Sequence, residues 1–387
     1  MRSQADCQGQ RLFMTTAIIF GVLLHDAEEK WLGRNQLMLA LSAHTKVVLL
    51  EQPRFSRALI EVRRPRVERL SNNLYVIRDA FGLRYQRVGK RFRWITGLLD
   101  AKWFHAALKQ IGITSYVYWL TVNDPAMALG IPDSSLVYDC MDPNFTPEKQ
   151  TEFDKSEAIL AKRAKMIFCS AHTLHKKMMA LNPNSFLLPN ACSKDTIKTV
   201  QAKEFEIPTS LVGRNRPFIG YMGTIDWRFD ANYVYEAAKE LSDYTFVIVG
   251  RINHDQEKNV ELLRSLPNVI LIGQVSYDEG HAYNLVFDVG LIPFTPGPMN
   301  DAINSVKMFM YLASGKPIVS TDIEECRRNP FVIASDSPHS FATNIRHAVT
   351  NNSSVEIQSR IDYALKNTWE DRSNAALEHL QSAGLHD

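Results

Sequence analysis

The sequence predicts an α/β protein of two doubly wound domains, each a parallel sheet with helices on both faces. Three observations lead to this fold class. Short apolar runs rich in β-branched residues alternate with helical stretches along the whole chain, which is typical of parallel sheets. The 387 residues exceed the roughly 250–300 at which a single core stops growing. A polar stretch from Ser193 to Pro217 separates two such series of elements, so we expect it to connect the domains.

The first domain, expected over residues 1–205, begins with the apolar run Leu12 to Leu24. This run follows Arg2 and Arg11 as the core of a signal peptide would, but no small-x-small cleavage pattern comes after it. It is also shorter than the roughly 20 residues of a membrane span, so we expect a buried first strand. The expected strands are 16–24, 46–51, 74–78, 115–121, 135–141, 166–171 and 185–189, and the helices are 31–43, 92–110, 148–164 and 172–181.

The second domain is expected over residues 206–365. The tail, residues 353–382, contains two further helical stretches, and we expect them to lie across a domain surface because they are too charged for a core. The expected strands are 218–225, 245–251, 269–275, 288–294, 317–321 and 331–335, and the helices are 231–241, 256–265, 278–286, 305–314 and 338–349.

The helix expected at 305–314 carries Lys307 in its first turn, after Asn304 or Ser305 as the cap. A cation there faces the positive end of the helix dipole, which is disfavoured by roughly 0.3–1 kcal/mol unless an anion lies between them. First-turn N–H groups and an ammonium group together are a recurrent phosphate site, so Lys307 is a candidate phosphate ligand. The alternative is a surface lysine with a half-buried stem. Its apolar stripe is expected to comprise Val306, Phe309, Met310 and Ala313, with Tyr311 and Ser314 beside it.

The loops that follow strands should carry the chemistry, because ligands of such sheets bind at the carboxyl ends of strands. The glycine-containing loop from Gly220 to Arg228 offers close backbone approach at Gly223, a hydroxyl at Thr224 and a phosphate-binding guanidinium at Arg228, although an ordinary glycine turn would look the same. No G-x-G-x-x-G fingerprint occurs, which disfavours a nicotinamide oxidoreductase. The loop 295–305 delivers the first turn of the lysine-bearing helix.

In the first domain, Asp139 and Asp142 lie at and just beyond the end of a strand. A carboxylate that emerges at a cleft is a candidate general base, and a cap for Asn144 or a role in the turn at Pro143 is the alternative. His25, after the first strand, could line the same cleft or be an ordinary loop histidine. No D-x-D in a useful loop and no His/Cys/Asp cluster with ligand spacing is present, so the sequence does not predict a metal-dependent mechanism.

Charge is distributed unevenly, although the net charge is only +2. Residues 54–93 contain twelve Lys and Arg against three Asp and Glu, interleaved with aromatic and aliphatic residues. This segment could rest on an anionic bilayer or receive a phosphorylated acceptor, or it could be a solvated surface; nothing beside it indicates nucleic acid. Five widely spaced cysteines, none in a C-x-x-C pair, favour the cytoplasm, with a peripheral position on the inner face of the plasma membrane as an alternative.

Several stretches together resemble the GT-B glycosyltransferases, specifically the group 1 (family 4-like) branch of bacterial envelope and exopolysaccharide synthesis. The matching stretches are LLPNA (187–191), GYMGTIDWRFD (220–230), LPNVILIGQVSYDE (266–279), FDVGLIPF (287–294), SVKMFMYLASGKPIVST (305–321) and NTWEDRS (367–373).

The resemblance implies two Rossmann-like domains across a cleft, with the terminal helix, residues 366–387, packing back on the first. It implies a nucleotide-diphosphate sugar as donor substrate and no other cofactor, a lipid-linked or oligosaccharide acceptor, and a metal-independent hexosyltransferase reaction. Asp142 matches an acidic position that is the catalytic base in some relatives, and Lys307 matches the lysine that contacts the donor diphosphate. The resemblance also implies donor contacts at Gly223 and Thr224, which approach the phosphates, and at Gly273 and Val275, beside the nucleobase. The loop and first-turn residues Arg228, Asn304, Ser305 and Val306 complete the expected donor contacts.

One departure from the family concerns the pair of glutamates eight residues apart, of which the second holds the donor ribose. Ala302 and Met310 occupy these positions here, and neither accepts a hydrogen bond from a hydroxyl as glutamate does. Asp301 or Asn304 could take over that role, the nucleotide could bind differently, or donor binding could be lost. The loss of donor binding would leave a non-catalytic scaffold subunit of a polysaccharide assembly complex. A nucleotide-sugar epimerase on the same architecture is a further alternative to a transferase.

Overall fold

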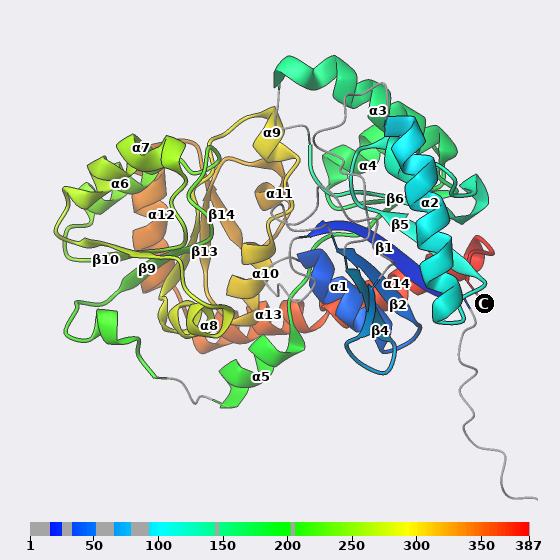
Figure 1. Ribbon diagram of the computed structural model, residues 1–387. Coiled ribbons are helices and arrows are strands. Elements are labelled where there is room, and N and C mark those ends of the chain that lie inside the picture. Colours follow the sequence, from blue (N-terminus) through cyan, green and yellow to red (C-terminus); the bar gives the residue numbers. More distant parts are fainter. Residues whose placement is uncertain are drawn as a thin grey trace, which may run out of the picture.

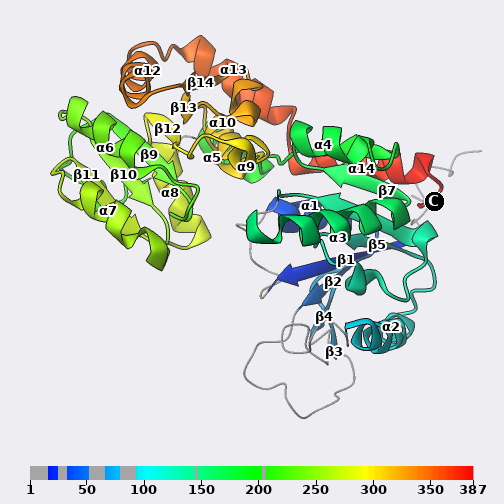
Figure 2. The same ribbon diagram turned by 90° about the horizontal axis from the view of Figure 1, so that it is seen from above.

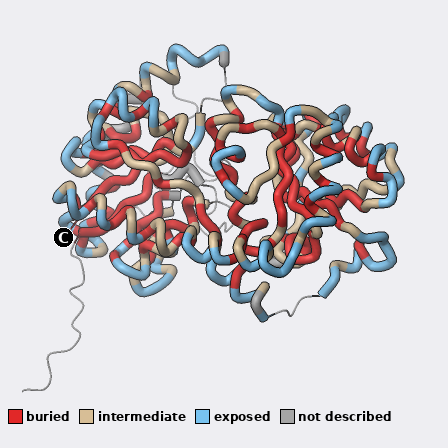
Figure 3. The backbone as a smooth tube through the Cα atoms, turned by 180° about the vertical axis from the view of Figure 1, so that it is seen from behind, coloured by how far each residue is buried: buried red, intermediate tan, exposed pale blue. Residues whose placement is uncertain are grey.

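The computed structural model describes residues 16–24, 33–51, 66–78, 93–143, 147–202 and 206–386. They form two α/β domains that stand side by side, each built on its own sheet (Figure 1). The buried parts of the chain lie mainly along the strands of each sheet, so each domain has its own core (Figure 3). The predicted fold class is confirmed.

The first sheet has the strand order β3-β4-β2-β1-β5-β6-β7-β8. Its strands are parallel except for β3, which pairs antiparallel with β4 at one edge. The order reverses between β1 and β5, which is where a doubly wound sheet binds its ligands. The strands are β1 (Ala17–Leu24), β2 (Val47–Glu51), β3 (Arg66–Arg69), β4 (Leu74–Arg78), β5 (Tyr116–Leu120), β6 (Leu136–Cys140), β7 (Met166–Cys169) and β8 (Ser185–Leu187).

Helices cover both faces of this sheet. On one face α1 packs against α14, and both share a core cluster with strand residues such as Phe20 and Trp119. On the other face Phe104, Leu160 and Leu174 bring α2, α3 and α4 into a second cluster. The helices are α1 (Gly33–Ser42), α2 (Arg93–Gln110), α3 (Gln150–Arg163), α4 (His172–Met179) and α14 (Trp369–Ser382).

The second sheet is entirely parallel within the described residues and has the order β11-β10-β9-β12-β13-β14. Its reversal falls between β9 and β12, so the loops after these two strands lie at its ligand-binding edge. The strands are β9 (Phe218–Met222), β10 (Thr245–Val249), β11 (Val269–Gly273), β12 (Val289–Ile292), β13 (Ile318–Thr321) and β14 (Val332–Ser335). The helices are α6 (Ala231–Glu240), α7 (Glu257–Arg264), α8 (Tyr277–Val286), α9 (Pro298–Asp301), α10 (Val306–Ala313), α11 (Glu324–Arg327), α12 (Pro338–Thr350) and α13 (Ser354–Leu365).

Four elements go beyond the predicted set. Strand β3 lies in the basic segment, α5 (Lys194–Ala202) lies in the stretch expected to connect the domains, and the short helices α9 and α11 lie after β12 and β13. Helix α5 contacts α10 and α13 and buries Ile197 against the second core. The boundary at residue 205 stays a prediction.

The description of the tail as too charged for a core is wrong. Trp369, Ala376 and Leu380 on α14 are 4%, 0% and 0% exposed and belong to the core of the first domain. The charges of α14 lie on its other face, so the helix is amphipathic. Figure 2 shows α14 along the first domain and α13 beside the second, which confirms that the terminal helix crosses back.

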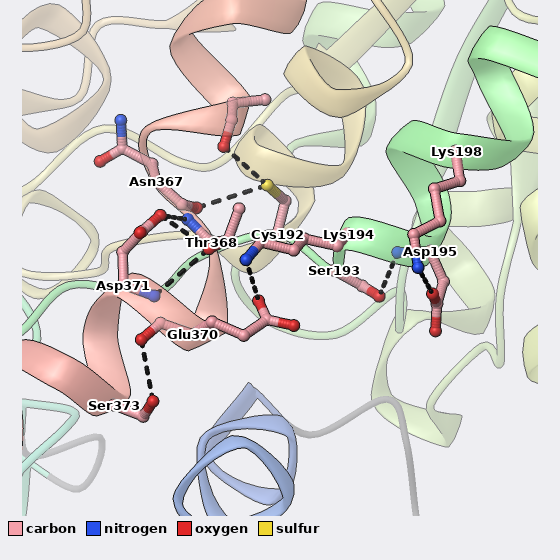
Figure 4. Close-up of polar contacts among 11 residues, drawn as sticks. Cys192, Ser193, Lys194, Asp195, Lys198, Asn367, Thr368, Glu370, Asp371 and Ser373 are labelled. Atoms are coloured by element: carbon pink, nitrogen blue, oxygen red, sulfur yellow. Dashed lines mark hydrogen bonds and ion pairs between the residues drawn. The ribbon is translucent and has the colours of Figure 1, made fainter. Parts of the chain in front are cut away.

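The chain passes between the domains near Cys192 and again near Thr368, and these two passages pair with each other (Figure 4). The N–H of Cys192 donates to the carbonyl of Asn367 at 3.1 Å, and the N–H of Trp369 donates to the carbonyl of Cys192 at 3.1 Å. Thr368 caps α14, exchanging hydrogen bonds with Asp371. Backbone pairing and the cap together fix where the second passage enters the first domain.

Candidate active site in the cavity between the domains

A cavity of about 300 Å³ lies between the two domains and is lined by residues of both. It lies where the strand orders of both sheets reverse, because its walls include the segments that follow β1, β5, β6, β9 and β12. From the first domain come Phe20, Gly33, Arg34, Thr121, Asp142 and Ser170, among others. From the second come Arg228, Phe294, Asn304, Ser305, Val306 and Lys307.

Lys307 lies in the first turn of α10, and this turn faces the cavity. Ser305 occupies the cap position but makes no capping hydrogen bond with its side chain, so that side chain does not compete with a ligand for the first-turn N–H groups. Nζ of Lys307 lies 4.6 Å from the centre of the Phe294 ring and 5.1 Å from that of Tyr221. Two aromatic faces therefore hold the ammonium group at the cavity wall.

The ammonium group of Lys307 has been removed from bulk water, and this burial lowers its pKa to about 7. The positive charge of Arg228 lowers the pKa further, while Asp226 opposes the shift. An anion entering the cavity would favour the charged form of the lysine and raise its pKa again. The site is therefore suited to gain a proton as it binds an oxyanion.

The buried surface of helix α10 is wider than the apolar stripe predicted for it. Tyr311, expected beside the stripe, is fully buried, and its hydroxyl accepts from the N–H of Met222 at 3.0 Å and donates to the carbonyl of Leu291 at 3.3 Å. Val306 and Met310, expected within the stripe, are partly exposed. These bonds attach α10 to β9 and β12 and so fix the position of its first turn.

Gly223 follows β9 directly, and its backbone lies close to the side chain of Lys307. Its φ of +147° lies in a region that side chains rarely adopt. A Cβ at this position would lie 2.9 Å from Cε of Lys307, so the glycine makes room for the lysine. Thr224 is not among the residues that line the cavity, although its carbonyl accepts from the hydroxyl of Tyr221 at 2.8 Å.

Arg228 lines the cavity, and its guanidinium group is held by the carboxylate of Asp226. Burial alone would lower the pKa of Arg228, but the hydrogen bonds and charge of Asp226 raise it. The guanidinium carbon lies 5.8 Å from the centre of the Phe294 ring, which also contacts Lys307. The second domain thus presents two cations around one aromatic ring.

Asp142 lies on the opposite wall of the cavity, and the residue is exposed. The surrounding protein displaces part of the water around its carboxylate and raises its pKa, and the charges of Arg228 and Arg34 oppose this shift. Asp139 has a different position from the one expected for a base at the cleft. It is fully buried, pairs with Arg34 at 2.8 Å and accepts from the indole N–H of Trp119 at 2.8 Å.

Asn304 lies at the cavity but is engaged in contacts between the domains. Its side-chain oxygen accepts from the N–H of Asn190 at 2.9 Å, and its amide nitrogen donates to Glu325 at 3.2 Å. Glu325 also accepts from the backbone N–H of His172 at 2.7 Å. Asp301 accepts from the N–H of Glu324 at 2.8 Å and so caps α11. Both residues that could replace the ribose-binding glutamate therefore have other partners.

The cavity thus brings together six of the predicted site residues: Asp142, Arg228, Asn304, Ser305, Val306 and Lys307. Gly273 is the last residue of the edge strand β11 and has a φ of +83°, and Val275 follows two residues later. Neither residue is among those that line the cavity. His25 lies outside the described residues, as does most of the segment 54–93.

Sequence reasoning missed Arg34, Asn190 and Glu325. Arg34 is 6% exposed and lies in the first turn of α1. The signal that could have found it is the one that found Lys307, a cation in the first turn of a helix that follows a buried strand. Nε and Nη1 of Arg34 are buried and have no hydrogen-bond acceptor among the described residues, and such an unmet group typically costs roughly 1–3 kcal/mol.

Two absences hold for the described part of the chain. His, Cys, Asp and Glu side chains do not group there in threes that could hold a metal ion. None of the helices described is both long and apolar enough to span a bilayer.

The fold is that of the GT-B glycosyltransferases. Sucrose-phosphate synthase from Thermosynechococcus elongatus aligns with 95% of this chain and 98% of its own, at a TM-score of 0.68 and 14% identity. The trehalose-6-phosphate structure from E. coli bound with UDP-2-fluoro glucose covers 94% and 99%, at a TM-score of 0.71 and 12% identity. The HepE structure from Anabaena in complex with UDP and glucose covers 95% and 100%, at 0.65 and 12%.

Residues 216–351, which lie in the second domain, match the family Glycosyl transferases group 1. Over 226 residues the chain is 30% identical to TuaH of Bacillus subtilis (strain 168), which is named as a candidate glycosyltransferase of teichuronic acid biosynthesis. The match covers 53% of this chain and 56% of TuaH, so the chain spans about half the length of the curated relative that it matches.

Proposed function

We propose that the chain is a glycosyltransferase that moves a sugar from a nucleotide-diphosphate donor to a lipid-linked or oligosaccharide acceptor in cell-surface polysaccharide synthesis. The observation that carries this proposal is the position of Lys307 and the first turn of α10 in a cavity that Asp142 lines from the other domain. The group 1 family match supports it, as does the likeness of fold to proteins solved with UDP and glucose or UDP-2-fluoro glucose. The name of TuaH supports a polysaccharide of the cell surface.

In this proposal the donor diphosphate binds between Lys307 and the N–H groups that begin α10, and Arg228 lies beside it. The cations neutralise the charge that develops on the departing diphosphate, which lowers the barrier to its release. Gly223 and Thr224 approach the phosphates with their backbone, while Gly273 and Val275 contact the nucleobase. No metal ion takes part in this mechanism, so the ammonium group and the helix amides carry the neutralisation.

Asp142 acts on the acceptor. The oxygen of the acceptor hydroxyl bonds to the anomeric carbon while the bond from that carbon to the diphosphate breaks, and the hydroxyl proton passes to the Asp142 carboxylate or is oriented by it. Its raised pKa brings this carboxylate closer to the range in which a base works near neutral pH.

The decisive experiment is a donor screen that measures release of the nucleoside diphosphate from a panel of nucleotide sugars. We expect one donor to be turned over and Lys307→Ala to abolish this turnover while the fold, followed by circular dichroism, survives. Lys316→Ala is the matched control, since Lys316 is also a largely buried lysine with a lowered pKa but bonds the carbonyl of Leu285 and does not line the cavity. Near-normal turnover in Lys307→Ala would refute the assignment.

A scaffold without catalytic activity is the second candidate, because Ala302 and Met310 replace the paired glutamates and both Asp301 and Asn304 have other partners. Isothermal titration with nucleoside diphosphates separates the two, since a scaffold would bind none. A nucleotide-sugar epimerase on the same fold would instead convert its donor with no acceptor present.

The position of the enzyme in the cell is a separate part of the proposal. We place it in the cytoplasm, peripheral to the inner face of the plasma membrane, with residues 54–93 as the contact to anionic lipid. Co-sedimentation with liposomes that contain anionic lipid should fall as salt is raised, and retention at high salt would contradict binding by charge.

A further inference from the structure

Arg34 places a second, unused set of hydrogen-bond donors at the cavity. Its Nη2 donates to Asp139 at 2.8 Å and to the carbonyl of Leu188 at 3.2 Å. Its Nε and Nη1 are buried and have no acceptor among the described residues. A guanidinium group that is 6% exposed has little contact with bulk water, so an acceptor that enters the cavity would satisfy these donors.

The charge of the cavity wall indicates what kind of ligand this is. Three cations line the cavity, Arg34, Arg228 and Lys307, while Asp142 is the one carboxylate among the lining residues described. Arg34 also lies in the first turn of α1, where the helix dipole adds to its charge. The ion pair with Asp139 uses only Nη2 and leaves the other donors of the guanidinium group to the ligand.

The two cations of the second domain lie beside Phe294. Arg34 is instead bound to the first-domain wall by Asp139 of β6 and by the carbonyl of Leu188, directly after β8. A diphosphate that binds to Lys307 and Arg228 of the second domain would leave Nε and Nη1 of Arg34 without an acceptor. The first domain, which also contributes Asp142, is where the acceptor lies in the proposed reaction.

We propose that Arg34 binds an anionic group of the acceptor, a carboxylate or a phosphate, on the first-domain wall of the cavity beside Asp142. This inference rests on the proposed function, since it concerns the second substrate of the same site. A sugar acid would supply the carboxylate, and a sugar phosphate or a lipid-linked sugar would supply the phosphate. Hydrogen bonds between a guanidinium group and an oxyanion are stronger than those to a neutral sugar hydroxyl. The acceptor is therefore selected by charge before its hydroxyl meets Asp142.

The test uses the full chain with Lys307→Ala as the background, so that the ammonium group of Lys307 cannot bind the probes, while Arg228 is the same in every variant compared. Inorganic phosphate, glucuronate and glucose are titrated separately by calorimetry. We expect phosphate or glucuronate to bind more tightly than glucose, and Arg34→Gln to weaken that binding about tenfold or more. Preference for phosphate would indicate a phosphorylated acceptor, and preference for glucuronate a sugar acid. Arg163→Gln is the matched control, because Arg163 pairs with Asp133 in the same domain and does not line the cavity.

Loss of Arg34 leaves Asp139 buried without its partner, so Arg34→Gln alone could unfold the domain. The double variant Arg34→Gln/Asp139→Asn removes both charges, so no unpaired charge is left buried. Its anion affinity tests the role of Arg34 without that cause of unfolding. Arg34→Lys keeps the charge but not the guanidinium donors, and should bind the anion with intermediate affinity. Equal binding of anions and glucose, or anion binding unchanged by the double variant, would overturn the proposal.

The outcome is distinguishable from failure of the proposed function. Nucleoside diphosphate binding by the chain with Lys307 intact tests the donor side alone. If that binding is normal and the anion titrations show no role for Arg34, the acceptor inference is wrong and the transferase proposal stands.

Discussion

Gly33, the first residue of α1, lies against Val306, the first residue of α10. A Cβ on Gly33 would come within 3.0 Å of Cγ2 of Val306, and within 3.0 Å of Asn190 and Trp369 as well. The starts of two helices from different domains therefore meet at the cavity wall. Because the N–H groups at helix starts carry partial positive charge, this contact concentrates positive potential where we place the diphosphate.

We expect Gly33→Val to separate the two helix starts and to weaken nucleoside diphosphate binding about tenfold or more, because the added side chain has no space in the observed arrangement. Calorimetric titration measures the affinity. Leu39→Val is the control for a β-branched residue in α1, since Leu39 is 43% exposed. Affinity equal to that of the unchanged chain would show that this contact does not shape the site.

The lowered pKa of Lys307 predicts that diphosphate binding depends on pH. Below about pH 7 the lysine is already charged, whereas above it the lysine must take up a proton to bind the anion. Affinity should therefore fall as pH rises above 7, by up to about tenfold per unit while the bound lysine remains protonated. Titration at pH 8 in two buffers of different ionisation enthalpy should detect uptake of up to one proton. An affinity that is constant from pH 7 to 9 would contradict the assignment.

The same shift predicts how stability varies in the free chain. Between pH 7 and the ordinary lysine range the unfolded chain holds a proton that the folded chain has released, so this residue makes stability rise with pH. Lys307→Met should remove this rise and should stabilise the chain at pH 6.5, by about 1 kcal/mol on the scale common for such changes. Urea unfolding at pH 6.5 and 9 measures it. A destabilised Lys307→Met at pH 6.5 would argue against a buried, unneutralised ammonium group.

Asp142→Asn keeps the size of the side chain and removes its ability to accept a proton. We expect kcat at saturating acceptor to fall by about 10²–10⁴, as for loss of a general base, with little change in KM for the donor. Asp133→Asn is the control, since Asp133 pairs with Arg163 at the surface of the same domain. An unchanged rate at saturating acceptor would remove the base role.

Trp369 joins the terminal helix to the first domain. It is 4% exposed within the core cluster that α14 shares with α1 and the first sheet. Trp369→Ala should destabilise the first domain by about 3–5 kcal/mol. Thermal unfolding measures the loss, with Leu365→Ala on α13, which is 41% exposed, as the control. Equal unfolding temperatures for the two variants would show that α14 is not part of this core.

Periodicity predicted the helices and parallel strands well, because buried strands are continuously apolar and the helices have clear ends. It failed for β3 (Arg66–Arg69), a short strand at the edge of the sheet in which Val67 is the single apolar residue. It also failed for α5, which is mostly polar and buries Ile197 only through contact with α10 and α13. In both cases the partner in the fold, and not the local sequence, determines the structure.

The candidate site was predictable where its signal is local. Lys307 is found from its place in one helix, and Asp142 from its place after one strand. Arg34 pairs with Asp139, which is 105 residues away, and Asn304 bonds to Asn190, which is 114 residues away. The first contact depends on how the elements of the first domain pack together, and the second on how the two domains meet, so local residue patterns do not reveal either of them.

The backbone pairing of Cys192 with Thr368 has a mechanical consequence. The two chain segments that connect the domains are joined to each other by backbone hydrogen bonds at this point. A rotation of one domain relative to the other would therefore use this point as a single hinge. Residues close to the pivot barely move in such a rotation, while the rim of the cavity farthest from it sweeps the longest arc. Substrates would thus enter and products leave on the side away from the tie.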